Sequence, residues 1–244
     1  MKYFLLEDQE AEDILSKRNL TIAVIGQGRM GLPISVVYLN AGFNVIGVDV
    51  NLSLIEKVNN GQIELQGEPG VEEGIIKGLQ ENRYYCTVNH DEAIKQADII
   101  IIIIPLILDA NKNPNLEPLI HLMEIVGSFL TPGQIVITET TLPIGTTEEL
   151  FKKILEEKSG LIAGKDFGLG FSPERTYSGR VIADITERYP KIIGGINQRS
   201  TDKIADFYET FVKKVTIRMS SVKAAEAVKI FKGVYSVIGI KASP

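Results

Sequence analysis

Six consecutive isoleucines, Ile99 to Ile104, lie between Asp98 and Pro105. The run is far shorter than the roughly 20 apolar residues that a membrane-spanning helix needs. Isoleucine is β-branched, which favours a strand over a helix. Because no polar residue interrupts the run, both faces of this strand must be covered, as they are in parallel sheets. The run therefore predicts a central strand between two layers of helices.

Strand-like and helix-like segments alternate on both sides of this run. We expect further strands at residues 21–25, 43–48, 134–138, 167–171, 191–193 and 215–219. We expect helices at residues 33–41, 52–59, 71–81, 116–129, 147–157 and 201–211, with a last helix starting near residue 221. An amphipathic helix over residues 3–18 precedes them. The alternation predicts an α/β fold, a Rossmann-type doubly wound parallel sheet with flanking helices.

A glycine turn links the first strand to the first helix. Gly26, Gly28 and Gly31 have the spacing G-x-G-x-x-G, and Arg29 and Met30 stand between the last two. The first glycine permits a tight turn, the second lets the backbone approach a pyrophosphate, and the third lets the helix pack on the sheet. The helix start adds unpaired N–H groups and a positive dipole end. The turn predicts a dinucleotide site, with Arg29 along the phosphates or the adenine.

Asp49 supplies the acidic residue that such a site requires. It follows the second strand, eighteen residues after Gly31, where its carboxylate can accept hydrogen bonds from both ribose hydroxyls. A 2′-phosphate would be repelled there, so NAD is favoured over NADP. The alternative is a glycine-rich turn followed by an unrelated surface aspartate. The order strand, turn, helix and acidic residue favours the cofactor site.

The composition excludes several other kinds of protein. A formal net charge of −5 leaves no basic surplus for nucleic acid or an anionic membrane surface. The single cysteine, Cys86, excludes a disulfide framework, and there is no Cys/His cluster for a metal. The first 20 residues lack the apolar run of a secretory signal. We therefore expect a cytoplasmic protein that has neither a metal nor a nucleic acid or membrane partner.

Five motifs occur in a fixed order along the chain. They are Gly28-Arg29-Met30-Gly31-Leu32-Pro33, residues 139–147 (ETTLPIGTT), Ser172-Pro173-Glu174-Arg175, Ile193-Gly194-Gly195 and Ala225-Glu226-Ala227-Val228-Lys229. With them the chain, from about residue 20 to about residue 238, resembles the UDP-glucose/GDP-mannose dehydrogenase family, and most closely its branch that oxidises UDP-N-acetylhexosamines such as UDP-N-acetylmannosamine. Members oxidise the sugar C6 hydroxyl to a carboxylate in two hydride transfers to NAD. The resemblance implies this reaction on a UDP-N-acetylmannosamine-like or UDP-glucose-like substrate.

The resemblance implies catalytic roles for three side chains. Thr141 matches a threonine beside the nicotinamide that helps to hold a catalytic water, and Glu174 matches an acid/base glutamate. Lys229 matches a lysine that stabilises the oxyanion at the sugar carbon. A base for the alcohol proton and an ammonium for the alkoxide also suit hydride transfer chemically. The structural alternatives are a turn residue for Thr141, a surface ion pair for Glu174 and a solvated helix position for Lys229.

The resemblance also implies binding contacts. Pro105 matches a loop that passes under the cofactor. Arg175 and Tyr177 fall on the loop that touches the nucleotide sugar, and Glu174 and Lys229 would contact the same substrate.

The resemblance divides the chain into three segments. We expect residues 1–19 to form an N-terminal helical extension and residues 20–219 to form the NAD-binding Rossmann domain. Residues 220–244 would be the truncated start of a central helical domain, through which complete family members form homodimers.

Three departures from the family pattern bear on activity. Leu106 replaces a threonine after the isoleucine run, and Gly233 replaces an asparagine that helps to hold the oxyanion. The loss of one such donor costs about 10²–10³ in rate. The family's cysteine for the second oxidation follows the lysine at a point beyond residue 244, and we expect Cys86 to pack as a small apolar residue instead. This 244-residue chain alone is therefore expected to be inactive or impaired in uronate formation.

Two other functions compete with this hypothesis. A β-hydroxyacid dehydrogenase shares the glycine-rich start and a late helical lysine, but the motifs at 139–147 and 172–175 speak against it. A non-catalytic NAD-binding remnant, or a regulatory partner of an intact paralogue, would account for Gly233 and for the missing cysteine. Turnover with UDP-sugars separates the remnant from the enzyme, whereas NAD titration does not.

Overall fold

An eight-stranded sheet fills the centre of the computed structural model, which describes residues 2–65 and 67–242, with side chains to residue 235. Its strands are β1 (Thr21–Ile25), β2 (Asn44–Val48), β3 (Tyr84–Thr87), β4 (Ile99–Ile102), β7 (Ile135–Thr138), β8 (Gly168–Phe171), β9 (Lys191–Gly195) and β10 (Thr216–Arg218). They lie in the order β10-β9-β8-β7-β4-β1-β2-β3. A separate hairpin joins β5 (Ile107–Leu108) to β6 (Pro114–Asn115).

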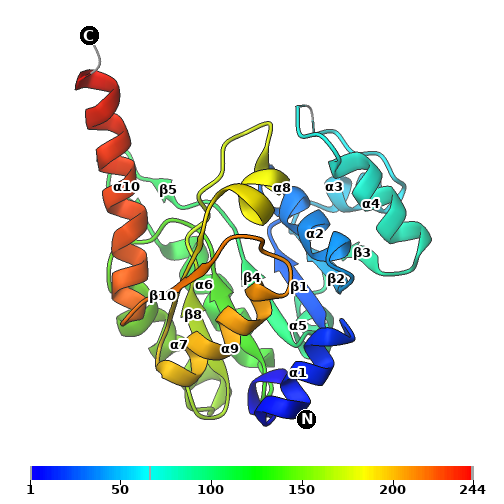
Figure 1. The fold of residues 1–244 in the computed structure, drawn as a ribbon, viewed down its shortest axis with the longest axis horizontal. Coiled ribbons are helices and arrows are strands. Elements are labelled where there is room, and N and C mark those ends of the chain that lie inside the picture. Colours follow the sequence, from blue (N-terminus) through cyan, green and yellow to red (C-terminus); the bar gives the residue numbers. More distant parts are fainter. Residues whose placement is uncertain (1, 66, 243–244) are drawn as a thin grey trace.

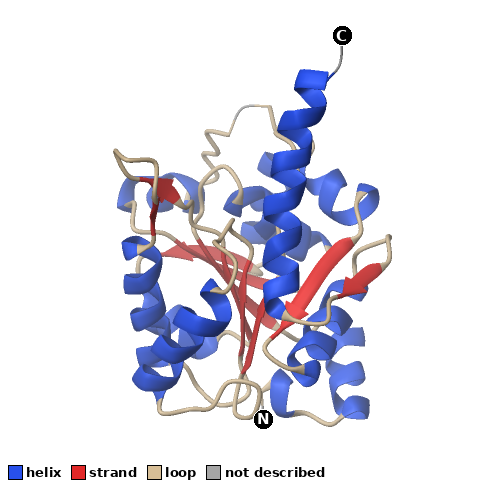
Figure 2. Cartoon of the chain, turned by 90° about the vertical axis from the view of Figure 1, so that its left-hand side faces the viewer, coloured by secondary structure: helices blue, strands red, loops and turns tan. Residues whose placement is uncertain are grey.

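Helices cover both faces of this sheet, which Figure 2 shows as a central layer. They are η1 (Tyr3–Leu5), α1 (Asp8–Ser16), α2 (Gly31–Asn40), α3 (Leu52–Asn59), α4 (Val71–Gln80), α5 (His90–Gln96), α6 (Glu117–Phe129), η2 (Thr146–Phe151), α7 (Lys152–Ser159), α8 (Val181–Ala183), η3 (Asp184–Arg188), α9 (Gln198–Glu209) and α10 (Val222–Ala242). The last helix stands beside the sheet, and its C-terminal end projects past the rest of the fold (Figure 1).

The isoleucine run is buried on both sides, as predicted. Ile99 and Ile101 pack into one apolar cluster with α2, α4 and α9, while Ile100 and Ile102 pack into a second cluster with α5, α6 and α7. All four side chains are inaccessible to solvent. Full burial of such a side chain contributes about 1.5–3 kcal/mol. The strand therefore contributes side chains to both halves of the core. The predicted Rossmann-type α/β fold is confirmed.

One edge of the sheet departs from the predicted parallel order. Strand β9 runs antiparallel to β8, with Gly170 opposite Gly195, and β10 then runs parallel to β9. A parallel connection needs a crossover that returns the chain to the other end of the sheet, usually along a full helix. The segment between β8 and β9 contains only the short helices α8 and η3, so the chain re-enters from the end at which it left.

The N-terminal segment is not the single helix that we predicted. It breaks at Leu6 into η1 and α1, because the chain turns there to bury Tyr3 and Phe4. The Phe4 amide donates to the carbonyl of Gly133 at 2.8 Å, and the Tyr3 hydroxyl donates to the carbonyl of Lys203 at 2.9 Å. Strand β3, helix α5 and the β5–β6 hairpin were not among the predicted elements either.

Candidate active site

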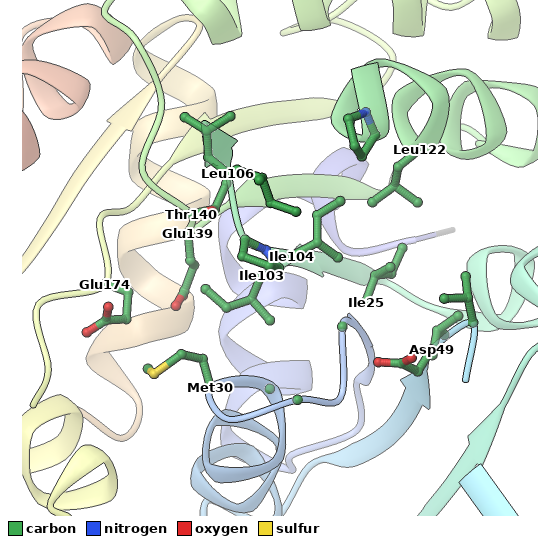
Figure 3. A pocket seen from close by; sticks show the side chains of 18 of the residues that line it. Ile25, Met30, Asp49, Ile103, Ile104, Leu106, Leu122, Glu139, Thr140 and Glu174 are labelled. Atoms are coloured by element: carbon green, nitrogen blue, oxygen red, sulfur yellow. The ribbon is translucent and has the colours of Figure 1, made fainter. Parts of the chain in front are cut away.

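A cavity of about 800 Å³ opens at the carboxyl ends of β1, β2, β4 and β7. The chain order reverses between β1 and β4, and ligands of doubly wound folds bind in the crevice at such a point. The volume falls in the range of small-molecule and cofactor sites. Figure 3 shows side chains from all four strand ends around this space. The site residues predicted from the sequence can therefore be described by whether they line this cavity.

The glycine turn forms the floor of the cavity between β1 and α2. Gly26 has φ +100°, which side chains other than glycine rarely adopt. A Cβ on Gly31 would lie 1.6 Å from the carbonyl oxygen of Gly26, so helix α2 can start there only with a glycine. A Cβ on Gly28 would meet nothing within 4 Å. The turn therefore leaves open space at its middle glycine, where a pyrophosphate can approach the backbone.

Gln27 holds this turn in place, a role that the sequence did not predict. Its side chain is fully buried, and its Nε2 donates to the carbonyl of Val24 at 2.8 Å. Its Oε1 accepts from the hydroxyls of Tyr84 at 2.8 Å and Ser35 at 3.2 Å. Position 27 is a variable position of the G-x-G-x-x-G spacing, so no motif signals this contact.

Asp49 lines the cavity at the end of β2, where the sequence placed it. Its Oδ2 accepts from the amide of Gln27 at 2.8 Å, and its Oδ1 accepts from the amide of Asn51 at 3.0 Å. A carboxylate offers about four acceptor positions, so capacity remains for hydroxyl donors from the cavity. The carboxylate thus both fixes the glycine turn and offers a partner to a ribose.

The loops after β4 and β7 form the opposite wall. Pro105 and Leu106 line it from the first loop, and Thr141 lines it from the second. Helix α6 adds His121 and Leu122, which the sequence did not single out. Most of this wall is apolar, which suits the flat face of an aromatic ring.

Glu174 and Lys229, 55 residues apart in the chain, meet at the edge of the cavity. The Lys229 Nζ lies 3.5 Å from Glu174 Oε2 and also donates to the Glu174 carbonyl. The amide of Thr176 donates to Glu174 Oε1. The Lys229 side chain is 21% exposed and the Glu174 side chain is 14% exposed, so the pair is largely shielded from solvent. An ammonium and a carboxylate are therefore available together at the mouth of the site.

Arg175 and Tyr177 lie outside the cavity lining, because the loop turns outward after Glu174. The Arg175 guanidinium stacks 5.6 Å from the Tyr189 ring, and Tyr177 is 49% exposed with the Arg180 guanidinium 4.7 Å from its ring. The Lys232 ammonium lies within 6 Å of both rings. Burial, followed by repulsion from Arg175 and Lys229, lowers the pKa of Lys232. These side chains form a cation–aromatic cluster next to the cavity.

Glu226 links α10 to the loop after β7, and the sequence assigned it no role. Its fully buried carboxylate accepts from the amide of Gly145 at 2.5 Å and from the amide and hydroxyl of Thr147 at 2.9 and 2.7 Å. Lys229 follows it by three positions on the same helix, and Thr141 precedes Gly145 on the same loop. The carboxylate thus sets the position of Lys229 relative to Thr141.

Neither Cys86 nor Gly233 lines the cavity. Cys86 is buried away from the cavity, with its Sγ 2.9 Å from the Tyr84 hydroxyl, and burial raises the pKa of this thiol to about 12. It packs in the core, as expected. Gly233 is exposed on α10, and a Cβ there would meet nothing within 4 Å. A larger side chain at this position would therefore fit.

The described part of the chain contains neither a metal-binding cluster nor a membrane-spanning helix. No group of three or more His, Cys, Asp and Glu side chains there is arranged to hold a metal ion. Within the same residues, no helix has both the length and the apolar character needed to cross a bilayer.

Known proteins match both the sequence and the fold. A Staphylococcus aureus protein named CapL is 36% identical over 88% of this chain and 48% of its own length. The UDP-N-acetyl-D-glucosamine 6-dehydrogenase of Salmonella typhi is 35% identical over 86% of the chain and 48% of its own length. A ternary complex of GDP-mannose dehydrogenase from Pseudomonas aeruginosa superimposes with a TM-score of 0.85 at 25% identity, covering 90% of this chain and 50% of that one.

The chain thus spans about half the length of the relatives it matches. Residues 20–212 match the model of the NAD-binding domain of the UDP-glucose/GDP-mannose dehydrogenase family. This range contains the glycine turn, Asp49 and Glu174. The chain belongs to the UDP-glucose/GDP-mannose dehydrogenase family and carries its NAD-binding domain.

Proposed function

We propose that this chain supplies the cofactor site and the first-oxidation residues for NAD-dependent oxidation of the C6 hydroxyl of a UDP-sugar to the uronate. The observation that carries the proposal is the shared cavity, which the glycine turn, Asp49, Thr141, Glu174 and Lys229 all line. Bound NAD would accept hydride from the sugar carbon. The family match supports a nucleotide sugar over a small β-hydroxyacid as substrate.

The cofactor half of the site is built by the first two strands. The open space at Gly28 and the start of α2 would receive the pyrophosphate, and the exposed Arg29 would lie along it. Met30 would contact the cofactor from the same turn. Asp49 would accept from the ribose hydroxyls and disfavour a 2′-phosphate. Pro105 would pack under the cofactor.

The catalytic half is built by Thr141, Glu174 and Lys229. Glu174 would accept the hydroxyl proton, directly or through a water held by Thr141. The Lys229 ammonium, 3.5 Å from the Glu174 carboxylate, would stabilise the alkoxide that forms before hydride leaves. Because Gly233 offers no donor, this stabilisation would be weaker than in a site with an additional amide.

The cation–aromatic cluster supports a nucleotide sugar as the ligand. Arg175 and Lys232 offer positive charge for a diphosphate, and the exposed Tyr177 ring offers a stacking face for a base. Two relatives in the comparison, the Salmonella typhi enzyme and a Pyrococcus horikoshii enzyme, carry the names of UDP-N-acetylglucosamine and UDP-N-acetylmannosamine dehydrogenases. We infer a UDP-N-acetylhexosamine as the preferred class.

A homodimer is the proposed assembly of the complete protein. Helix α10 exposes Phe231, Val234 and Tyr235 at 66%, 51% and 79%. Apolar surface of this kind is typical of interfaces. Residues 220–244 would then be the start of the dimerisation domain, and residues 1–19 an extension that packs on the core.

Binding and turnover with UDP-sugars test this function. The NAD-saturated chain is titrated with UDP-N-acetylmannosamine and UDP-glucose, and NADH and uronate are measured in parallel. We expect sugar-nucleotide binding that weakens in Lys229→Met, with little net uronate because the chain spans half of its relatives. If the NAD complex binds no UDP-sugar, the proposed substrate contacts of this chain are contradicted. Oxidation of a small β-hydroxyacid instead would contradict the assigned substrate class.

A further inference from the structure

A buried ionic cluster lies under the cavity, and none of the roles assigned above uses it. Glu139 follows β7 and is 1% exposed. Its Oε1 accepts from the Lys191 ammonium at 2.9 Å, from the Tyr208 hydroxyl and, weakly, from the Tyr38 hydroxyl at 3.5 Å. Lys191 is itself buried, and its ammonium also lies 4.5 Å from the Tyr208 ring. One carboxylate oxygen is thus bound by three donors.

The other oxygen has no partner. Glu139 Oε2 is buried and receives no hydrogen bond in the described part of the chain. Lys191, Tyr208 and Tyr38 do not line the cavity, whereas Glu139 does, so the three donors approach from the side opposite the cavity. Figure 3 shows the Glu139 side chain among the lining residues, between Glu174 and Ile103. A buried acceptor without a donor carries a desolvation cost, which a ligand with an N–H group can remove.

The position of this oxygen indicates which part of a ligand would reach it. In the proposed NAD site, Asp49 and the glycine turn would hold the adenosine and pyrophosphate over β1 and β2, so the second half of the dinucleotide would extend over β4 and β7. The nicotinamide ring carries one amide N–H₂ donor. The side chains of nearby Ile103 and Met30 offer no strong acceptor, and the Glu174 carboxylate is engaged by Thr176 and Lys229.

We propose that Glu139 is a positioning residue for the cofactor, whose Oε2 accepts a hydrogen bond from the nicotinamide carboxamide. Lys191 and Tyr208 hold the carboxylate from behind, so its free oxygen is fixed before the cofactor arrives. Fixing the carboxamide fixes the ring about its glycosidic bond, and therefore the face that it presents to Glu174 and Lys229. The inference rests on the NAD site proposed above and adds the contact that orients the ring.

Binding of three ligands distinguishes the contribution of this contact from that of the rest of the site. Dissociation constants are measured for NAD, for its 3-acetylpyridine analogue, which lacks the amide N–H₂, and for ADP-ribose, which lacks the ring. We expect the parent chain to bind NAD about tenfold more tightly than the acetyl analogue, the value of one charge-assisted hydrogen bond. ADP-ribose reports on the adenosine and pyrophosphate half alone.

The variant Glu139→Gln tests the residue directly. Lys191 requires an acceptor, so the glutamine oxygen stays in the Oε1 position and its NH₂ group takes the place of Oε2. We expect the preference for NAD over the acetyl analogue to disappear or to invert, while ADP-ribose affinity is unchanged. The matched control Tyr208→Phe removes a donor to Oε1 and leaves Oε2 in place, so it should keep the preference.

Each outcome is decisive. If the parent chain does not discriminate between NAD and the acetyl analogue, the proposal is overturned, whether or not Glu139→Gln folds. It is also overturned if Glu139→Gln keeps the full preference. If neither NAD nor ADP-ribose binds the parent chain, the NAD site itself fails. ADP-ribose binding therefore separates failure of the orienting contact from failure of the proposed function.

Discussion

Removing the Glu226 carboxylate should lower the free energy of unfolding more than removing an exposed charge does. Glu226→Ala deletes three hydrogen bonds to a buried carboxylate and leaves the amides of Gly145 and Thr147 without an acceptor. A buried donor left without an acceptor costs about 1–3 kcal/mol, so the two amides together predict a loss of about 3–5 kcal/mol. Glu226→Gln keeps the volume and one acceptor oxygen, so we expect a loss of about 1–2 kcal/mol. Both values are large against total stabilities of about 5–15 kcal/mol.

Urea unfolding followed by circular dichroism measures these differences in the free energy of unfolding. Glu148→Ala is the matched control, because Glu148 follows the Glu226 partner Thr147 on η2, is 44% exposed and pairs with Lys223 on α10 at 3.5 Å. An exposed pair of this kind is worth less than about 1 kcal/mol. If Glu226→Ala were no more destabilising than Glu148→Ala, the role of Glu226 in joining α10 to the loop after β7 would be wrong.

Three further perturbations have defined outcomes. Asp49→Ala should weaken NAD binding by about 1–3 kcal/mol in calorimetric titration, since it removes acceptors for the ribose and for the Gln27 amide, and an unchanged affinity would contradict the placement of the ribose. Burial raises the pKa of Cys86 to about 12, so the folded thiol should resist alkylation at pH 8 until urea unfolds the chain. Because the folded-state pKa is the higher one, its stabilising contribution is complete below the unfolded thiol pKa and is lost as pH rises toward 12. Gly233→Ala, at an exposed helical position, should raise the free energy of unfolding by up to about 1 kcal/mol, and a loss would show that Gly233 is needed for packing.

Local patterns in the sequence were enough to predict the centre of the fold and most of the site. The isoleucine run, the glycine turn and Asp49 can each be interpreted from a few neighbouring residues, and all lie where they were expected. The motifs of Glu174 and Lys229 identified two residues that the fold then brought within 3.5 Å of each other.

The features that sequence did not predict depend on partners far apart in the chain. Glu139 and Glu226 are charged residues that a pattern would place at the surface, and each is buried because its donors arrive from distant elements. Gln27 stands at a position for which the motif sets no residue. The antiparallel edge depends on how the segment between β8 and β9 folds, which its composition does not reveal.

Calorimetric titration of the chain with NAD and with NADP measures whether the cavity binds NAD selectively. We expect one NAD per chain, bound at least about tenfold more tightly than NADP, because the Asp49 carboxylate would accept from a ribose hydroxyl and would repel a 2′-phosphate. Equal affinity for the two cofactors, or no binding of NAD, would contradict the assignment of the cavity as an NAD site.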